Sequence, residues 1–231
     1  MLTLGIETSA DVCSVALLNG SDPVVELAIL RPRSHATRLA PLIQEALVHA
    51  GAQPADLDMV AVSAGPGSYT GLRIGLSTAK GLCLSANAAL TPVPTLHALA
   101  DAAQSVSMSG DGIVVAARSR RGEIYGAAFE RVGHELVCAR ESAPVALVDL
   151  PEWLPSYPQT WVMGDAASSV LDVLGSAGRP LPTRPSALRV AHRGRQLAEA
   201  NQTVDVATFE PSYLKPFEAS QPRAIFPDMS A

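Results

Sequence analysis

The chain is poor in aromatic residues, poor in cysteine and without a long hydrophobic run. Aromatics make up only 4% of the 231 residues, so the core must be aliphatic and stacking platforms for nucleobases are not evident. The net charge of −5 argues against an autonomous nucleic-acid-binding protein, which normally carries a basic surplus. Hydrophobic residues at 48% and charged residues at 17% are nevertheless typical of a folded globular chain.

Three cysteines that lie far apart in the sequence fit a reducing compartment better than a disulfide framework. Cys13, Cys83 and Cys138 form no C-x-x-C pair, and an odd, scattered set is typical of buried thiols. No run of eighteen apolar residues occurs, so we expect no membrane span. The first residues lack a basic region and are interrupted by Glu7, so we expect no signal peptide. These features together predict a cytoplasmic protein.

The most informative stretch covers residues 59–81. Residues 59–64 are a short apolar run with a β-branched centre, which is typical of a buried strand. Gly65-Pro66-Gly67 then predicts a tight turn, and Ser68 is a good N-cap for a helix. The expected order is therefore strand, glycine turn, helix.

This helix has one face that is nearly without side chains. Gly71, Gly75 and Ala79 fall four residues apart, and each interior glycine costs about 1 kcal/mol relative to alanine. A soluble helix that keeps this cost usually lets another backbone approach closely. The pattern leaves three interpretations open: tight packing on the helix's own sheet, contact with another subunit, or amides that face a phosphate.

Periodicity predicts the remaining elements. Alternating or apolar runs predict strands over 2–7, 13–18, 24–30, 90–94, 112–117, 123–130, 134–140 and 160–163, with a hairpin at Asn19-Gly20. Three- and four-residue spacing predicts helices over 34–50, 95–104, 166–174 and 187–201. Residues 151–159 are rich in proline and predict a connector.

The segment Ser63-Ala-Gly-Pro-Gly-Ser-Tyr-Thr-Gly-Leu-Arg-Ile-Gly75, together with Gly5-Ile-Glu-Thr-Ser9, closely resembles the TsaB (YeaZ) family. Members of this family are non-catalytic bacterial partners in making threonylcarbamoyladenosine (t6A) on tRNA. The resemblance implies an α/β, two-lobed, actin-like, sugar-kinase-like, Hsp70-like (ASKHA) fold with mixed sheets flanked by helices. It places an amino-terminal lobe at 1–105 and a carboxyl-terminal lobe at 106–231, whose last segment packs back between the lobes.

The resemblance also implies partners. We expect the chain to bind and activate the catalytic subunit TsaD, with the ATPase TsaE, for transfer of threonylcarbamoyl to the adenosine beside the anticodon in tRNAs that read codons starting with A. tRNA would be met only within this complex, and the isolated chain would form homodimers. The expected interface consists of His35, Leu39, Leu42, Ile43, Ala46, Tyr69, Gly71, Leu72, Arg73, Gly75, Leu76 and Ala79. In this hypothesis Gly71 and Gly75 permit close approach, Leu72 and Leu76 fill the seam, and Arg73 pairs with the partner.

The same resemblance marks a place for a phosphate. Glu7, Thr8, Ser9, Gly65 and Gly67 match the phosphate-loop positions, although these residue types also form ordinary turns. We expect no intrinsic cofactor, with ATP or ADP at the interface with the partner left open. At the second phosphate hairpin Arg118 stands where the family commonly has an aspartate, and Gly164-Asp-Ala lies where the superfold contacts adenosine.

Two alternatives remain, and both are enzymes. A stand-alone ATPase or kinase of the same superfold needs acids at both phosphate hairpins, and Arg118 removes one of them. A metallopeptidase needs a metal-binding constellation, yet where TsaD carries two histidines four apart this chain has His97 and Asp101. We therefore expect no catalytic residue and no metal site. Five arginines between 179 and 195 form either a contact for tRNA phosphates or a solvated helix face.

Overall fold

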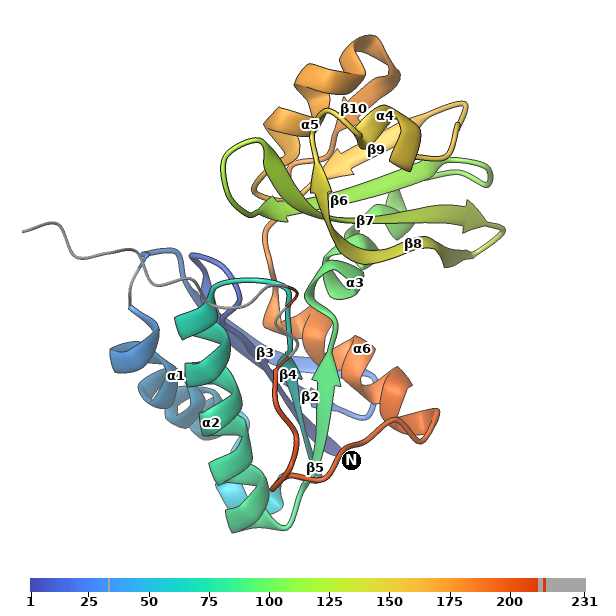
Figure 1. Ribbon diagram of the computed structural model, residues 1–231. Coiled ribbons are helices and arrows are strands. Elements are labelled where there is room, and N and C mark those ends of the chain that lie inside the picture. Colours follow the sequence, from blue (N-terminus) through green and yellow to red (C-terminus); the bar gives the residue numbers. More distant parts are fainter. Residues whose placement is uncertain (33, 212–213, 215–231) are drawn as a thin grey trace, which may run out of the picture.

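The computed structural model describes residues 1–32, 34–211 and 214, and the strands there form two five-stranded mixed sheets (Figure 1). The first sheet has the order β3-β2-β1-β4-β5 and the second the order β8-β7-β6-β9-β10. In each, an antiparallel meander is extended by two parallel strands. The two halves thus repeat one topology, which confirms the expected two-lobed ASKHA class. The strands are β1 (Leu2–Glu7), β2 (Cys13–Asn19), β3 (Asp22–Ile29), β4 (Met59–Ser63), β5 (Ala89–Val93), β6 (Gly112–Arg118), β7 (Glu123–Val132), β8 (Glu135–Ala146), β9 (Thr160–Met163) and β10 (Gly178–Pro180).

Helices cover both faces of the first sheet. α1 (His35–His49) and α2 (Tyr69–Ala86) contact each other and lie on one face, while α6 (Ala187–Glu199) lies on the other (Figure 1). The α6 backbone comes very close to the sheet, because a Cβ on Gly5 would lie 2.2 Å from the Ala187 carbonyl oxygen and one on Gly194 would lie 2.3 Å from the Ala61 Cβ. A helix from the second half of the sequence therefore belongs by its packing to the first sheet.

The second sheet has its own helices. α3 (Thr95–Ala100), followed by a 3₁₀ turn over Asp101–Ser105, packs on one face with Leu96, Leu99 and Phe129 in the core. α4 (Leu150–Trp153) and α5 (Ala167–Leu174) pack on the opposite face around Val170. The proline-rich connector expected over 151–159 thus begins within a short helix, and the three-residue β10 was not predicted. Elements this short carry too few residues to show a period.

The chain after α6 returns to the first sheet. Val204 forms an isolated β-bridge with Leu90 of β5. The Ala207 carbonyl accepts a hydrogen bond of 3.1 Å from the Lys80 Nζ of α2. The final segment that we expected between the lobes lies largely outside the described residues, which omit 212–213 and 215–231. Within the described part of the chain, no helix is both long and apolar enough to cross a membrane.

Candidate functional site

The glycine turn locks the start of α2 onto the loop between β1 and β2. Ser68 caps the helix, since its hydroxyl accepts a hydrogen bond of 3.2 Å from the Gly71 amide. The Ser68 amide itself donates to the Ser9 carbonyl at 2.7 Å. A Cβ on Gly67 would lie 2.4 Å from that same carbonyl oxygen, so only glycine fits there. The predicted strand, turn and cap are all present.

The glycine face of α2 packs inward, which corrects the role we expected for it. A Cβ on Gly71 would lie 2.0 Å from the Thr8 carbonyl oxygen, and one on Gly75 would lie 2.2 Å from the Thr8 Oγ1. The close approach therefore occurs within the chain, between α2 and the end of β1. Leu72 is only 1% exposed and Leu76 only 7%, so neither can fill a seam with a second polypeptide in this conformation.

The residues predicted on α1 are buried as well. Leu39, Leu42, Ile43 and Ala46 belong to the core of the first lobe, as does Ala79 of α2. A three- and four-residue apolar stripe marks the face of a helix that is removed from water, and here its own sheet removes it. The expectation that these side chains themselves meet a partner is corrected in the same way.

Three of the predicted interface residues lie elsewhere. His35 is buried, and its Nε2 lies 3.2 Å from the Val12 carbonyl oxygen. Tyr69 is half-buried and Arg73 is exposed, with the guanidinium carbon of Arg73 4.3 Å from the centre of the Tyr69 ring. This cation–π contact holds Arg73 over the first turn of α2.

α2 also has an outward face that the sequence analysis did not single out. Its exposed residues are Thr70, Arg73, Ser77, Gly81, Leu84 and Ser85, which we call the outer face of α2. Gly81 lies in the interior of this 18-residue helix, yet apart from the adjoining backbone of the helix no atom of the described chain lies within 4 Å of where its Cβ would be. Leu84 is 72% exposed, as is Val48 on the neighbouring α1. The signal that identifies Gly81 is the one already used for Gly71 and Gly75, an interior glycine.

The predicted phosphate residues surround the same turn, and two of them line a cleft there. Ser9 and Gly67 contribute to the wall of a cleft of about 580 Å³. Glu7 is buried, and its Oε1 accepts hydrogen bonds of 2.6 Å from both the amide and the hydroxyl of Ser9. Burial raises the pKa of the Glu7 carboxyl. Glu7 therefore shapes the loop, and the Gly65 amide is likewise engaged, with the Thr95 hydroxyl at 3.2 Å.

The opposite wall of the cleft contains a contact between two segments that the sequence treats separately. Arg118, at the end of β6, donates its amide to Asp165 Oδ1 at 2.8 Å, and its Nε lies 3.6 Å from Asp165 Oδ2. Both residues line the cleft. The Gly164-Asp-Ala turn can approach because a Cβ on Gly164 would lie 2.1 Å from the Ala116 carbonyl oxygen. An acid thus reaches the second hairpin from a turn 47 residues further along the chain.

The two residues expected at TsaD's histidine positions have different partners. Asp101 lies 3.4 Å from Arg193 Nη1 of α6, whereas His97 Nε2 lies 3.2 Å from Glu141 Oε2 of β8. They do not share a site. Among the other arginines of the basic stretch, Arg195 is ion-paired with Glu199, and Arg189 donates to the Arg184 carbonyl at 3.4 Å. Much of this stretch therefore has roles within the chain.

Residues 30–170 match the protein-family model described as TsaD, tRNA N6-adenosine threonylcarbamoyltransferase. The tRNA threonylcarbamoyladenosine biosynthesis protein TsaB of Escherichia coli is 29% identical over 224 residues, covering 93% of this chain and 95% of that one. TsaB of Bacillus subtilis is 27% identical over 231 residues, covering 95% and 96%. A tRNA N6-adenosine threonylcarbamoyltransferase of Solidesulfovibrio magneticus is 40% identical over 113 residues, covering 42% of this chain and 30% of that one.

Among solved structures, YeaZ from Pseudomonas aeruginosa superposes with a TM-score of 0.77. It is 24% identical, and the match covers 92% of this chain and 99% of that one. At this identity the likeness establishes a shared fold across both lobes.

Proposed function

Because this chain belongs to the TsaD family, in the branch of proteins named TsaB or YeaZ, we propose that it is the non-catalytic subunit of the complex that makes t6A. Members of this branch take part in t6A biosynthesis on tRNA. The observation that carries the proposal is the extent of similarity: proteins named TsaB align over nearly the whole chain, whereas the threonylcarbamoyltransferase aligns over less than half of it.

In this proposal the catalytic subunit is TsaD, and the ATPase TsaE joins it. The chain binds TsaD and fixes its geometry, while TsaD transfers threonylcarbamoyl to the adenosine beside the anticodon in tRNAs that read codons starting with A. tRNA contacts the chain only inside this assembly, which agrees with the net charge of −5.

The surface offered to TsaD is the outer face of α2 with the adjoining exposed part of α1. Gly81 supports this choice, because an exposed interior glycine costs about 1 kcal/mol and none of the described residues outside its helix occupies the space beside it. A partner backbone passing close to α2 would explain it. Leu84 and Val48, each 72% exposed, add apolar area of the kind that interfaces bury. In the isolated chain the same surface would pair with a second copy.

A nucleotide belongs in the cleft rather than at a catalytic centre of this chain. The first turn of α2 and Arg118 on the opposite wall offer amides and a guanidinium to an anion. We place ATP or ADP there only when TsaD is bound. The alternative function, a stand-alone ATPase or kinase, needs a free acid at the first hairpin. Glu7 is buried and engaged with Ser9, so this alternative would have to use Asp11 in the wall of the cleft.

A reconstitution distinguishes the two functions. Purified TsaD and TsaE, ATP, the threonylcarbamoyl-adenylate donor and unmodified tRNA are combined with and without this chain, and t6A is measured by mass spectrometry of the digested tRNA. We expect t6A only when the chain is present, and no ATP turnover by the chain alone. Equal t6A without the chain, or steady ATP hydrolysis by the chain by itself, would contradict the accessory role.

A further inference from the structure

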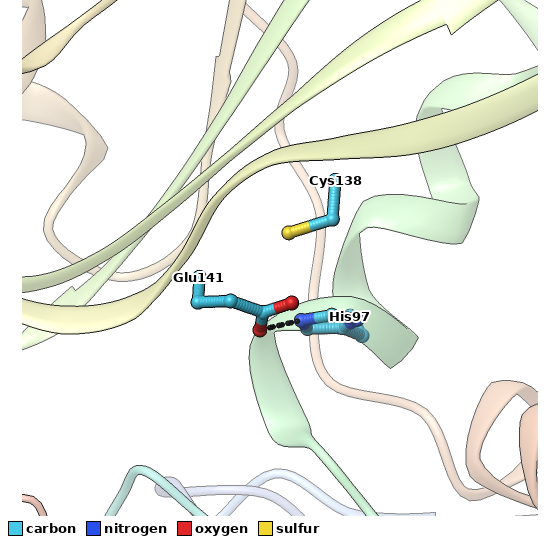
Figure 2. Close-up of side chains that lie close together, drawn as sticks. All are labelled: His97, Cys138 and Glu141. Carbon is cyan, nitrogen blue, oxygen red and sulfur yellow. Dashed lines mark hydrogen bonds and ion pairs between the residues drawn. The ribbon is translucent and has the colours of Figure 1, made fainter.

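Three side chains with metal-binding atoms meet between α3 and β8, and none of them lines the cleft. His97 comes from α3, and Cys138 and Glu141 come from β8 (Figure 2). One ligand atom from each lies within 4.8 Å of the other two. A histidine nitrogen, a cysteine sulfur and a carboxylate oxygen are therefore gathered at one point, although His97 and Glu141 are 44 positions apart in the sequence.

A bulge in β8 brings the two strand residues to the same face. Residues three apart on a regular strand point to opposite faces of the sheet. Here Cys138 pairs with Phe129 and Arg140 pairs with Ala128, so β8 has one more residue than β7 between these pairs. The extra residue shifts the alternation and places Glu141 on the side of Cys138 and Phe129. That side is the one covered by α3.

The His97 side chain is packed against its neighbours, whereas the Glu141 side chain is exposed. The His97 ring stands edge-on to Phe129, with ring centres 4.9 Å apart, and its side chain is 12% exposed, compared with 80% for Glu141. Burial lowers the pKa of His97, which favours the neutral imidazole that binds metals. Arg193 acts electrostatically on His97 and Cys138, and Asp101, 3.4 Å away, offsets its charge.

We propose that His97, Cys138 and Glu141 form a three-ligand site for a transition-metal ion of the zinc class, with the fourth position open to water or to a ligand from outside the chain. Thiolate and imidazole ligands favour such ions over magnesium and calcium, which prefer oxygen ligands throughout. One thiolate and one carboxylate balance the two positive charges of the ion. Binding converts the Cys138 thiol to a thiolate and releases its proton to solvent.

The site requires only a small closure of the donors. Zinc bonds of about 2.0–2.3 Å place tetrahedral donors roughly 3.5 Å apart, and the present donors lie within 4.8 Å of one another. Glu141 Oε2 already lies 3.2 Å from His97 Nε2, so the movement required is mainly that of the Cys138 sulfur toward this pair. The donor set differs from the pair considered in the sequence, because Asp101 is held by Arg193 and does not take part. A bound ion would tie α3 to β8 independently of the proposed binding of TsaD.

Cobalt(II) added to the metal-free full-length protein tests this site directly. We expect saturation at one ion per chain, with the visible absorption of four-coordinate cobalt and a near-ultraviolet thiolate-to-cobalt band. Zinc should displace the cobalt and abolish both absorptions. No saturable binding, or cobalt bound without the thiolate band, would overturn the proposal.

Matched variants locate the donors. Removing a residue that only hydrogen-bonds a metal ligand weakens metal binding by about 10–100-fold. Removing a ligand itself should cost more, so Cys138→Ser and His97→Gln should each weaken cobalt binding by at least about 100-fold. Cys138→Ser should also remove the thiolate band. Glu141→Gln changes an exposed side chain, so the fold should tolerate it, and its affinity loss tests the site even if the buried variants fold poorly.

Two control variants retain the site. Cys83→Ser removes a buried thiol elsewhere in the chain. His49→Gln removes an exposed histidine 3.9 Å from Glu45, a pair without a thiol. Cobalt affinity and the thiolate band should be unchanged in both. A band that persists in Cys138→Ser or disappears in Cys83→Ser would overturn the assignment.

Discussion

The side chain of Thr8 lies against the backbone of Gly75, where a Cβ would be 2.2 Å from the Thr8 Oγ1. This contact explains why α2 keeps a glycine there. It also separates the two kinds of interior glycine in α2, since the Cβ position of Gly81 has no described neighbour within 4 Å outside the backbone of its own helix. We therefore expect alanine at Gly75 and alanine at Gly81 to have opposite effects on the stability of the protein.

Gly75→Ala should destabilise the protein by about 1–3 kcal/mol, because the added methyl group overpacks a closed contact. Gly81→Ala should stabilise it by about 0.5–1 kcal/mol through helix propensity alone. Urea unfolding followed by circular dichroism measures both. The Thr8 Oγ1 makes no hydrogen bond among the described residues, so Thr8→Ala should restore much of the stability lost in Gly75→Ala. Equal effects of the two alanine substitutions would contradict the packing argument.

Gly81→Leu should abolish co-purification with TsaD while leaving the chain folded, because the new side chain projects from the outer face of α2 and its Cβ meets no described residue outside the helix. Ser168→Leu, on the exposed surface of α5, is the matched control and should co-purify normally. In sedimentation of the isolated proteins, Gly81→Leu should reduce self-association and Ser168→Leu should leave it unchanged. Normal TsaD binding by Gly81→Leu would rule out this face as the docking surface.

Glu7 should make stability depend on pH in a particular direction. Burial raises its pKa above the ordinary 4.5, although hydrogen bonds from Ser9 act in the opposite sense. The folded state therefore holds this proton more tightly than the unfolded chain does. The resulting stabilisation is complete below pH 4.5 and is lost as pH rises through the folded-state pKa. Glu7→Gln keeps an acceptor for the Ser9 amide and does not titrate. Its melting temperature relative to the wild type should therefore rise with pH over this range, and a constant difference would count against the raised pKa.

The Asp101–Arg193 pair should contribute measurably to stability, because the two side chains are only 17% and 24% exposed. Asp101→Ala should cost about 2 kcal/mol, in the range of a hydrogen bond to a charged group. The double variant with Arg193→Ala should cost less than the sum of the single variants, since it leaves no uncompensated charge. Urea midpoints of the four proteins give the coupling. Strict additivity would mean that the pair does not join the 3₁₀ turn after α3 to α6 energetically.

The cysteines should react slowly while the metal-free protein is folded. Burial raises the pKa of both Cys13 and Cys83 to about 11 from 9.0, which lowers the thiolate fraction at neutral pH by about 100-fold. Alkylation with iodoacetamide, followed by intact mass, should show little modification of either residue until urea is added. Rapid labelling of Cys13 or Cys83 in the native chain would contradict this expectation.

Local patterns predicted most elements well. Strand β9 was expected over 160–163 and is Thr160–Met163, and the helix expected over 34–50 is His35–His49. The Ser68 cap and the tight turn before it were also correct. These features depend on neighbours within a few residues, where spacing and propensity act directly. Strand β8 was expected to end at residue 140 but continues to Ala146. This extension was missed because the length of β8 is set by its pairing with β7.

The candidate site was harder to predict, since it depends on which face of a helix the chain covers. The stripe of Leu39, Leu42 and Ile43 indicated a buried face, but the sequence does not say whether the chain itself or a partner buries it. The structure assigns that face to the first sheet. The contact of Arg118 with Asp165 gave no local signal either, because the two residues are 47 positions apart in the sequence.

By itself, the sequence determined the strand–turn–helix unit, the aliphatic composition of the core and the resemblance to TsaB proteins, because each of these is written in consecutive residues. Only the tertiary structure decided that Gly71 and Gly75 face Thr8 while Gly81 faces outward, and that a bulge brings Cys138 and Glu141 to the same side as His97. The physical reason is that a side chain's neighbours are set by packing between distant segments, which local spacing does not encode.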